Sequence, residues 1–217
     1  DADGGTIIIG AVDDDDGGDA SGSAYIFDAA TRTQLIKLTA ADAEPGDQFG
    51  TDVGIHGNTA IVGAFREDAA GNYAGAAYLY NATTGQQKAK LLGLDVDQYD
   101  EFGRSVAIHG AKVIVGAPYG NVGRGAAYVF SASSGLQELR LTPGVADADP
   151  GDEFGNAVAI SSEYAVVGAF KDDGLSMGSG NIGAVYVFSL SDGHLLHKLV
   201  ASDATLGDEF GFSVAIH

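Results

Sequence analysis

The pentapeptide "GDEFG" at residues 151–155 decides the fold, because closely similar pentapeptides recur along the chain. They read "GDQFG" at 46–50, "YDEFG" at 99–103 and again "GDEFG" at 207–211. The Phe–Gly pairs within them are separated by 53, 52 and 56 residues. A fixed period of this size is typical of a repeat architecture in which each copy builds one supersecondary unit.

Each repeat contains four short segments that are rich in β-branched and aromatic residues and are bounded by Gly, Asn, Asp or Ser. In the second copy they are "FGTDVGIH" (49–56), "TAIVGAF" (59–65), "GAAYLY" (75–80) and "QQKAKLL" (86–92). Such segments predict β-strands. The second one is nearly all apolar, which indicates a strand covered on both faces. A Phe at one fixed place in every copy suits a side chain wedged between neighbouring sheets, and the Gly beside it permits close backbone approach.

Four strands per unit of about fifty residues predict an all-β fold, a β-propeller of four-stranded antiparallel blades over residues 1–217. The repeats run approximately over residues 1–48, 49–101, 102–153 and 154–209. Residues 210–217 either complete the first blade and close a four-bladed ring, or start the next blade of a larger ring. A solenoid ranks second, because its units would be shorter or helical.

Composition bounds the class of protein. The 217 residues include 45% hydrophobic ones, enough for a packed core, and no cysteine for a disulfide or a thiolate metal site. With 11 Lys and Arg against 30 Asp and Glu, the formal charge of −19 would repel nucleic acid and anionic membrane. The sequence contains no run of about 18 apolar residues, so it predicts no transmembrane segment in this chain.

A Gly-Ala triplet ends the second predicted strand of each repeat, and it completes a recognisable repeat signature. The triplets are Gly10-Ala11-Val12, Gly63-Ala64-Phe65, Gly116-Ala117-Pro118 and Gly168-Ala169-Phe170. Together with the Phe–Gly pairs they resemble the FG-GAP repeat of integrin α-subunits and of many bacterial and algal surface proteins. The resemblance covers essentially the whole chain. It implies a β-propeller, usually of seven blades, that acts outside the cell in adhesion or ligand binding.

The turn between the first two strands departs from the integrin pattern. Integrin-type repeats often carry a calcium loop of the form D-x-D-x-D-G-x-x-D there, whereas this chain has the short turns "HGNTA", "HGAKV" and "SSEYA". Only the N-terminal "DADGG" keeps part of that loop, through Asp1 and Asp3. The chain is therefore similar to a short-turn variant of the family.

Acidic residues recur two, five and seven positions before the Phe–Gly pairs. As candidate calcium ligands they are Asp42, Glu44, Asp47, Asp95, Asp97, Asp100, Asp147, Asp149, Asp152, Asp203 and Asp208. Calcium prefers several oxygen ligands that converge from a flexible loop, and this spacing supplies two or three. The alternative is that the aspartates accept backbone N–H groups and hold four identical turns.

A second group of acids follows the first Gly-Ala triplet. This loop holds the further candidate calcium ligands Asp13, Asp14, Asp15, Asp16 and Asp19. Since a loop of this charge repels itself, a bound cation would stabilise it. The alternative is an ordinary solvated acidic surface. Calcium is the one cofactor to which these patterns point.

The even distribution of the acids over the repeats argues against a single active site, so we expect a protein that is not an enzyme. The leading hypothesis is an extracellular or cell-surface module for adhesion or structural interaction, which presents propeller loops to a protein or glycan, alone or within a larger chain or assembly. The alternatives are a calcium-assisted, lectin-like carbohydrate-binding propeller and a polysaccharide-active enzyme domain. Asn81 begins the sequon "NAT", a candidate N-glycosylation site in a predicted turn.

Overall fold

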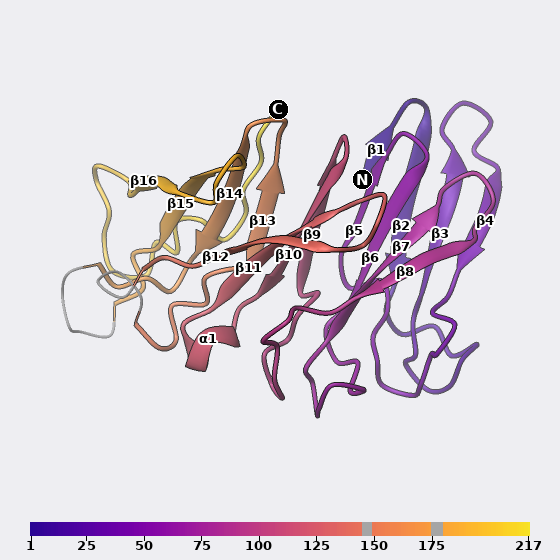
Figure 1. Cartoon of the computed structure of the whole chain (residues 1–217), viewed down its shortest axis with the longest axis horizontal. Coiled ribbons are helices and arrows are strands. Elements are labelled where there is room, and N and C mark those ends of the chain that lie inside the picture. Colours follow the sequence, from indigo (N-terminus) through magenta and orange to yellow (C-terminus); the bar gives the residue numbers. More distant parts are fainter. Residues whose placement is uncertain (145–148, 175–179) are drawn as a thin grey trace.

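The computed structural model describes residues 1–144, 149–174 and 180–217, and it contains four antiparallel four-stranded sheets that follow one another along the chain (Figure 1). The first sheet holds β1 (Ala2–Asp3), β2 (Thr6–Ala11), β3 (Ser23–Asp28) and β4 (Gln34–Leu38). The second holds β5 (Val53–His56), β6 (Thr59–Ala64), β7 (Ala76–Asn81) and β8 (Gln87–Leu91). The third holds β9 (Ser105–His109), β10 (Lys112–Ala117), β11 (Ala126–Ser131) and β12 (Gln137–Leu141). The fourth holds β13 (Ala157–Ile160), β14 (Tyr164–Ala169), β15 (Ala184–Ser189) and β16 (Leu195–Leu199).

These sheets confirm the predicted all-β fold and the four-stranded antiparallel unit. Even a small irregularity repeats, because the register between the third and fourth strands shifts by one residue at the same place in every sheet. The one helix in the described part of the chain is α1 (Gly120–Gly123), a single turn in which Asn121 and Val122 have left-handed dihedrals. The architecture is compatible with propeller blades.

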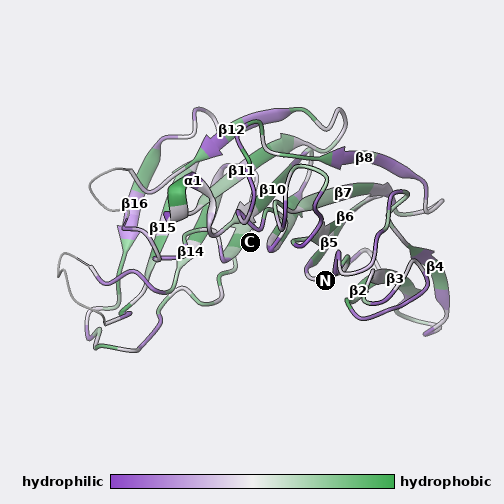
Figure 2. Ribbon diagram, turned by 90° about the horizontal axis from the view of Figure 1, so that it is seen from below, coloured by the Kyte–Doolittle hydropathy of each residue, from purple (hydrophilic) through white to green (hydrophobic). Residues whose placement is uncertain are grey.

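Consecutive sheets face one another, and the four together form an open arc (Figure 2). The apolar side chains of β6 explain the stacking, since alternate residues point to opposite faces of a strand. Ala60 and Val62 face the first sheet, whereas Ile61 faces the third. A strand buried on both faces needs apolar residues at every position, which accounts for the near-continuous apolar run in the sequence.

The Phe of each Phe–Gly pair lies between two sheets where a following sheet exists. Phe49 is completely buried, and its ring lies edge-on against Tyr78 and Tyr80 of the second sheet, with centroids 5.5 and 5.9 Å apart. Phe102 and Phe154 are equally buried and make the same two ring contacts with the next sheet. The predicted wedge is confirmed at these three positions.

The Gly of the pair lies where two backbones meet. The N–H of Gly50 donates to the carbonyl of Gly63 in β6 at 2.8 Å, and Gly50 adopts a φ of +94° that side chains rarely allow. A Cβ on Gly63 would overlap the carbonyl of Gly103 in the next repeat. Both glycines of the signature are therefore required by close approach.

For residues 210–217 the sequence left two arrangements open, and the structure does not show the first of them. Residues 210–217 do not complete the first sheet, because β1 already occupies that place and pairs Ala2 with Ile7. Val214 and Ile216 pack instead against the outer face of the fourth sheet. The physical reason is local, since the chain continues directly from the preceding sheet and buries its apolar residues there. Closure by these residues into a four-bladed ring is not found, and membership of a larger ring stays a prediction.

Asp1 and Asp3, which in the sequence match part of the integrin-type calcium loop, contact the second sheet. The Asp1 carboxylate accepts the N–H of Ile55 at 2.9 Å, and the Asp3 carboxylate accepts the N–H of Gly57 at 2.7 Å. These two acids therefore join the first sheet to the second.

Candidate interaction site at the loop end of the sheets

The described acids of both predicted groups belong to the connections between sheets and to the loop between β2 and β3, which lie at one end of the sheets, the lower end in Figure 1. The connections between sheets and the long loops between second and third strands meet there. A parallel bridge ties each loop to the following connection. The bridges are Gly22–Phe49, Gly75–Phe102, Gly125–Phe154 and Gly183–Phe210. The loop end is therefore held to the sheets at every repeat.

The aspartate two residues before each Phe locks a turn. In all four copies its Oδ2 accepts the backbone N–H of the residue three positions earlier. The pairs are Asp47 with Glu44 at 2.8 Å, Asp100 with Asp97 at 2.9 Å, Asp152 with Asp149 at 2.9 Å, and Asp208 with Thr205 at 2.7 Å. These contacts are the ones that the turn-holding alternative predicts. Glu44, Asp97 and Asp149, five positions before each Phe, take part in them as donors of their backbone N–H groups.

The acid seven residues before the Phe meets a cation from the next sheet. Asp42 pairs with Lys90 of β8 at 2.7 Å, and Asp95 pairs with Arg140 of β12 at 2.8 Å. Burial alone would raise the pKa of Asp42, but the Lys90 ammonium outweighs it and holds that pKa below its ordinary value. Asp203 is exposed, and Asp147 lies outside the described residues.

Sequence reasoning missed these cations. They recur at one place in the fourth strand of each sheet, as Lys37, Lys90, Arg140 and Lys198. A basic residue in phase with the repeat was the signal that could have revealed them. In a chain with few basic residues, a basic residue at a fixed repeat position indicates a partner for the recurring acids.

The acidic first loop is organised around one of these lysines. Asp14 accepts the Tyr25 hydroxyl at 2.7 Å and the Lys37 ammonium at 3.0 Å, and Asp16 also pairs with Lys37. The Tyr25 hydroxyl and then the Lys37 ammonium hold the pKa of Asp14 far below its usual range. In the fourth sheet, Asp172 makes the same contacts with Tyr186 and Lys198.

The remaining acids of this loop make fewer contacts. Asp15 accepts the N–H of Ala20 at 2.9 Å, while Asp13 and Asp19 are exposed. Within the described ranges, no group of three or more acidic or histidine side chains is arranged to hold a metal ion. Ammonium and N–H groups already contact the carboxylates of Asp14, Asp42 and Asp47, so a calcium ion there would share these carboxylates with them or displace them. Calcium binding stays a prediction.

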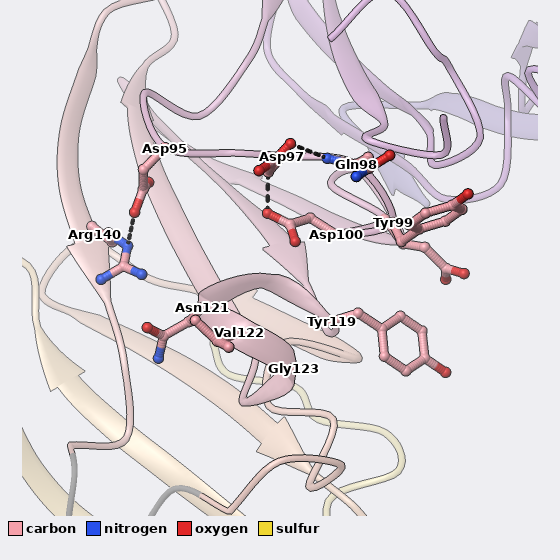
Figure 3. Close-up of a pocket in the computed structure, with 11 residues that line it drawn as sticks. Asp95, Asp97, Gln98, Tyr99, Asp100, Tyr119, Asn121, Val122, Gly123 and Arg140 are labelled. Carbon is pink, nitrogen blue, oxygen red and sulfur yellow. Dashed lines mark hydrogen bonds and ion pairs between the residues drawn. The ribbon is translucent and has the colours of Figure 1, made fainter. Parts of the chain in front are cut away.

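A groove of about 740 Å³ lies at this end, between the connection 95–101 and the loop 119–123. Figure 3 shows the Asp95–Arg140 pair at one side and the rings of Tyr99 and Tyr119 at the other. Both tyrosines are exposed, and the ring of Tyr99 lies 6.1 Å from that of Tyr73. We call Tyr73, Tyr99 and Tyr119 the tyrosine row.

Charged side chains accompany the tyrosine row. The guanidinium of Arg66 lies over the Tyr73 ring at 5.7 Å, and that of Arg104 pairs with Glu101 at 3.0 Å. Glu153 is buried; it accepts the Tyr119 hydroxyl at 3.0 Å and pairs with Lys171. The groove therefore combines aromatic surface with carboxylates.

The residue immediately before each Phe has a left-handed backbone although none is glycine. These residues are Gln48, Glu101, Glu153 and Glu209, with φ of 54° or 55°. Left-handed non-glycine residues store about 1–3 kcal/mol each and often mark functional positions. The repeated Glu or Gln in the sequence was the overlooked signal.

Comparison with known families accounts for the repeat. A family model described as the FG-GAP repeat matches residues 33–80, 86–130 and 136–188, more than half of the chain. The chain belongs to the FG-GAP repeat family. Each FG-GAP match runs from the fourth strand of one sheet to the third strand of the next, so it contains the Phe–Gly wedge between them. A search of curated proteins found no match.

Two further features of this FG-GAP chain concern glycosylation and the membrane. Asn81 was predicted in the turn after the third strand and is instead the last residue of β7; its Oδ1 accepts the N–H groups of Thr83 and Thr84, each at 2.9 Å. Its glycosylation stays a prediction. No helix in the described ranges has the length and apolar character to span a membrane.

Proposed function

We propose that this FG-GAP chain is a non-enzymatic interaction module outside the cell or on its surface, which binds a protein partner through the tyrosine row and the adjoining groove. The single observation that carries the proposal is the exposed tyrosine row next to a carboxylate-lined groove. Tyr and Arg are enriched in binding hot spots, because they offer large, amphipathic surfaces.

The backbone that carries Tyr73 and Tyr99 is held in place, which favours the same site for binding. Tyr99 lies one residue before the turn lock of Asp100, and its N–H donates to the carbonyl of Asn72 at 2.8 Å. Tyr73 and Tyr99 both have positive φ, at 53° and 67°. Side chains that project from a fixed backbone lose little entropy when a partner binds.

Charge supports a basic segment on the partner. The chain carries a net −19, and Asp97, Asp100 and Glu101 line the groove. A negatively charged groove attracts Lys- and Arg-bearing surfaces and speeds their encounter. The partner would therefore present a basic residue beside an apolar one.

Binding of Lys- and Arg-containing peptides to the intact chain, measured by fluorescence anisotropy, tests this function. Removing a hot-spot side chain costs about 2 kcal/mol, so Tyr99→Ala should weaken binding roughly thirtyfold. Tyr164→Ala is the matched control, because Tyr164 is an exposed tyrosine of β14 outside the groove. Equal affinity in both variants, or no preference for basic over acidic peptides, would contradict the proposal.

A calcium-assisted glycan binder is the second candidate, favoured by exposed tyrosine rings beside carboxylates. A glycan array with and without chelator tests it, and binding that needs calcium and disappears in Tyr99→Ala would support it. A polysaccharide-active enzyme is the weakest alternative, since Asp95 and Asp100 of the groove are held by Arg140 and by a backbone N–H.

A further inference from the structure

The third repeat lacks an acidic side chain that the other three repeats share. Four residues after the first Gly of each Gly-Ala triplet stand Asp14, Glu67 and Asp172, and in the third repeat Gly120. In every repeat the carbonyl of this residue accepts the N–H of the glycine before the third strand, at 2.8–2.9 Å. Gly120 therefore keeps the backbone contact of the repeat, and only the carboxylate is missing.

The three acids at this position hold the cation of the fourth strand. The pairs are Asp14–Lys37 at 3.0 Å, Glu67–Lys90 at 2.8 Å and Asp172–Lys198 at 2.8 Å. In the second repeat Lys90 also pairs with Asp42, at 2.7 Å. One cation between two carboxylates is therefore an arrangement that this chain already contains.

Arg140, the fourth-strand cation of the third repeat, has one of these two partners. Its Nε pairs with Asp95 at 2.8 Å, as Lys90 pairs with Asp42. Among the described residues, no second carboxylate pairs with Arg140. A guanidinium binds carboxylates through parallel N–H groups, so its two terminal Nη atoms are suited to a second one.

A buried hydroxyl lies beside the same guanidinium. Tyr128 of β11 is opposite Arg140 of β12, is completely buried, and its hydroxyl makes no hydrogen bond within the described part of the chain. In the first and fourth repeats the equivalent hydroxyl donates to the aspartate, at 2.7 and 2.6 Å. In the second repeat, where the acid is the longer Glu67, the Tyr78 hydroxyl has no partner either. A carboxylate placed like the two aspartates would accept the Tyr128 hydroxyl, which is costly to leave unpaired.

The place of the missing acid is accessible. A Cβ added to Gly120 would meet its nearest side-chain atom at 3.5 Å, an ordinary van der Waals distance, and Gly120 has no positive φ. Arg140 lines the groove of about 740 Å³ together with Asn121 and Gly123. Figure 3 shows the guanidinium beside that loop. A group that enters the groove can therefore reach Arg140.

We propose that the groove binds a carboxylate side chain of the partner at Arg140, in the place that an acid of the chain itself fills in the other three repeats. The inference rests on the proposed function, because it names a second group on the same protein partner. The Asp or Glu of the partner pairs with the Nη atoms of Arg140, while its basic residue lies near Asp97 and Glu101 of the groove. The neighbouring acids do not prevent this, since Lys90 holds two carboxylates in the second repeat.

A variant that restores the acid tests this place without a partner. Gly120→Asp puts a carboxylate beside Arg140, and Gly120→Ala makes the same backbone change without the charge. We expect the thermal midpoint of Gly120→Asp to exceed that of Gly120→Ala by about 2–4 °C. The difference should disappear in an Arg140→Gln background. Equal midpoints, or a difference that persists without Arg140, would overturn the inference.

Peptide arrays on the intact chain test the carboxylate of the partner. Each peptide carries Lys beside an apolar residue and one Glu at a varied position, and a matched array carries Gln in place of that Glu. For the best pair, measured by fluorescence anisotropy, the Glu peptide should bind roughly tenfold more tightly, because charge-assisted contacts are stronger than neutral ones.

Two substitutions should abolish this preference for Glu. Arg140→Gln removes the guanidinium, and Gly120→Asp fills the place with a carboxylate of the chain itself. Gly120→Ala should keep the preference. Arg32→Gln is the matched control and should also keep it, because Arg32 is an exposed arginine in the turn between β3 and β4.

The outcomes separate this inference from the proposed function. Binding of the Lys-bearing peptides without a preference for Glu over Gln would leave the proposed function in place and overturn the inference alone. Absence of binding by every peptide would overturn both. A preference that survives Arg140→Gln, or that is lost equally in Arg32→Gln, would place the carboxylate elsewhere and would also overturn the inference.

Discussion

Phe102 lies edge-on against Tyr128 of the next sheet, with the ring centroids 5.5 Å apart and both side chains fully buried. This contact joins a connection to the following sheet and recurs at each internal interface. Phe210, which has no following sheet, keeps the same place in its own repeat but remains exposed. Phe102 and Phe210 therefore allow a comparison between a Phe packed between two sheets and the equivalent Phe without a following sheet.

The wedge predicts a difference in stability. Phe102→Ala leaves a cavity between the second and third sheets and should lower the free energy of unfolding by about 3–5 kcal/mol. Phe210→Ala removes the same side chain from an exposed place and should cost about 1 kcal/mol or less. Urea unfolding at low protein concentration measures both, and equal losses would contradict the wedge.

The turn locks predict a second difference. Asp100→Ala removes the acceptor for the N–H of Asp97 at a buried site and should cost about 1–3 kcal/mol. Asp208→Ala removes the same bond at an exposed site, where water replaces the acceptor, so the cost should be smaller. Thermal unfolding of both variants checks this, and Asp100→Asn should recover part of the loss because its amide oxygen can accept.

The acid–cation contacts predict which of two lysines contributes more to the free energy of unfolding. Lys90→Met leaves the buried carboxylate of Glu67 without its ammonium partner, 2.8 Å away, and should cost about 1–3 kcal/mol. Lys112→Met removes a more exposed pair with Glu138 and should cost about 0–1 kcal/mol. If urea unfolding gave the reverse order, the buried pair would not contribute as inferred.

Stability should increase as pH falls from 7 toward 5. Burial, and then repulsion from neighbouring acids, raises the pKa of Asp47 and of Asp152 to about 6. A folded-state pKa above the unfolded value means that protonation favours the folded state, and this contribution is lost as pH rises through 6.

At lower pH the effect should reverse. Asp14 and Asp42 have pKa values below their ordinary range, so their contribution is present above the unfolded pKa and is lost as pH falls through the folded one. The thermal midpoint should therefore peak between about pH 4 and 6. Asp47→Asn should flatten the slope between pH 5 and 7, and a midpoint that falls steadily from pH 7 to 5 would contradict this assignment.

Local pattern predicted strands well where burial on both faces imposed an apolar run, as in β6 and β10. For residues 210–217 it left two alternatives, completion of the first sheet or the start of a next one, because their sequence matches that of β9 with its flanking Phe–Gly. In β9, Val106 pairs with Val115 of the same sheet. Val214 has the same neighbours in sequence but no second strand to pair with, and it packs on the preceding sheet.

The candidate site was predictable only in part. The acids before each Phe–Gly pair were found from their spacing, and so was the alternative that they hold turns. Their cations were missed because Asp42 and Lys90 lie 48 residues apart, and only the stacking of two sheets brings them together. The tyrosine row was missed for the same reason, since Tyr73, Tyr99 and Tyr119 come from different loops.

By itself the sequence determined the repeat, its four strands and the Phe–Gly wedge, because these depend on short-range pattern and on glycine's conformational freedom. Only the tertiary structure decided that the sheets form an open arc, that lysine and arginine side chains hold the recurring acids, and that three tyrosines from different loops lie along one groove. Those properties depend on contacts between residues far apart in the sequence, where packing and not local preference sets the partner.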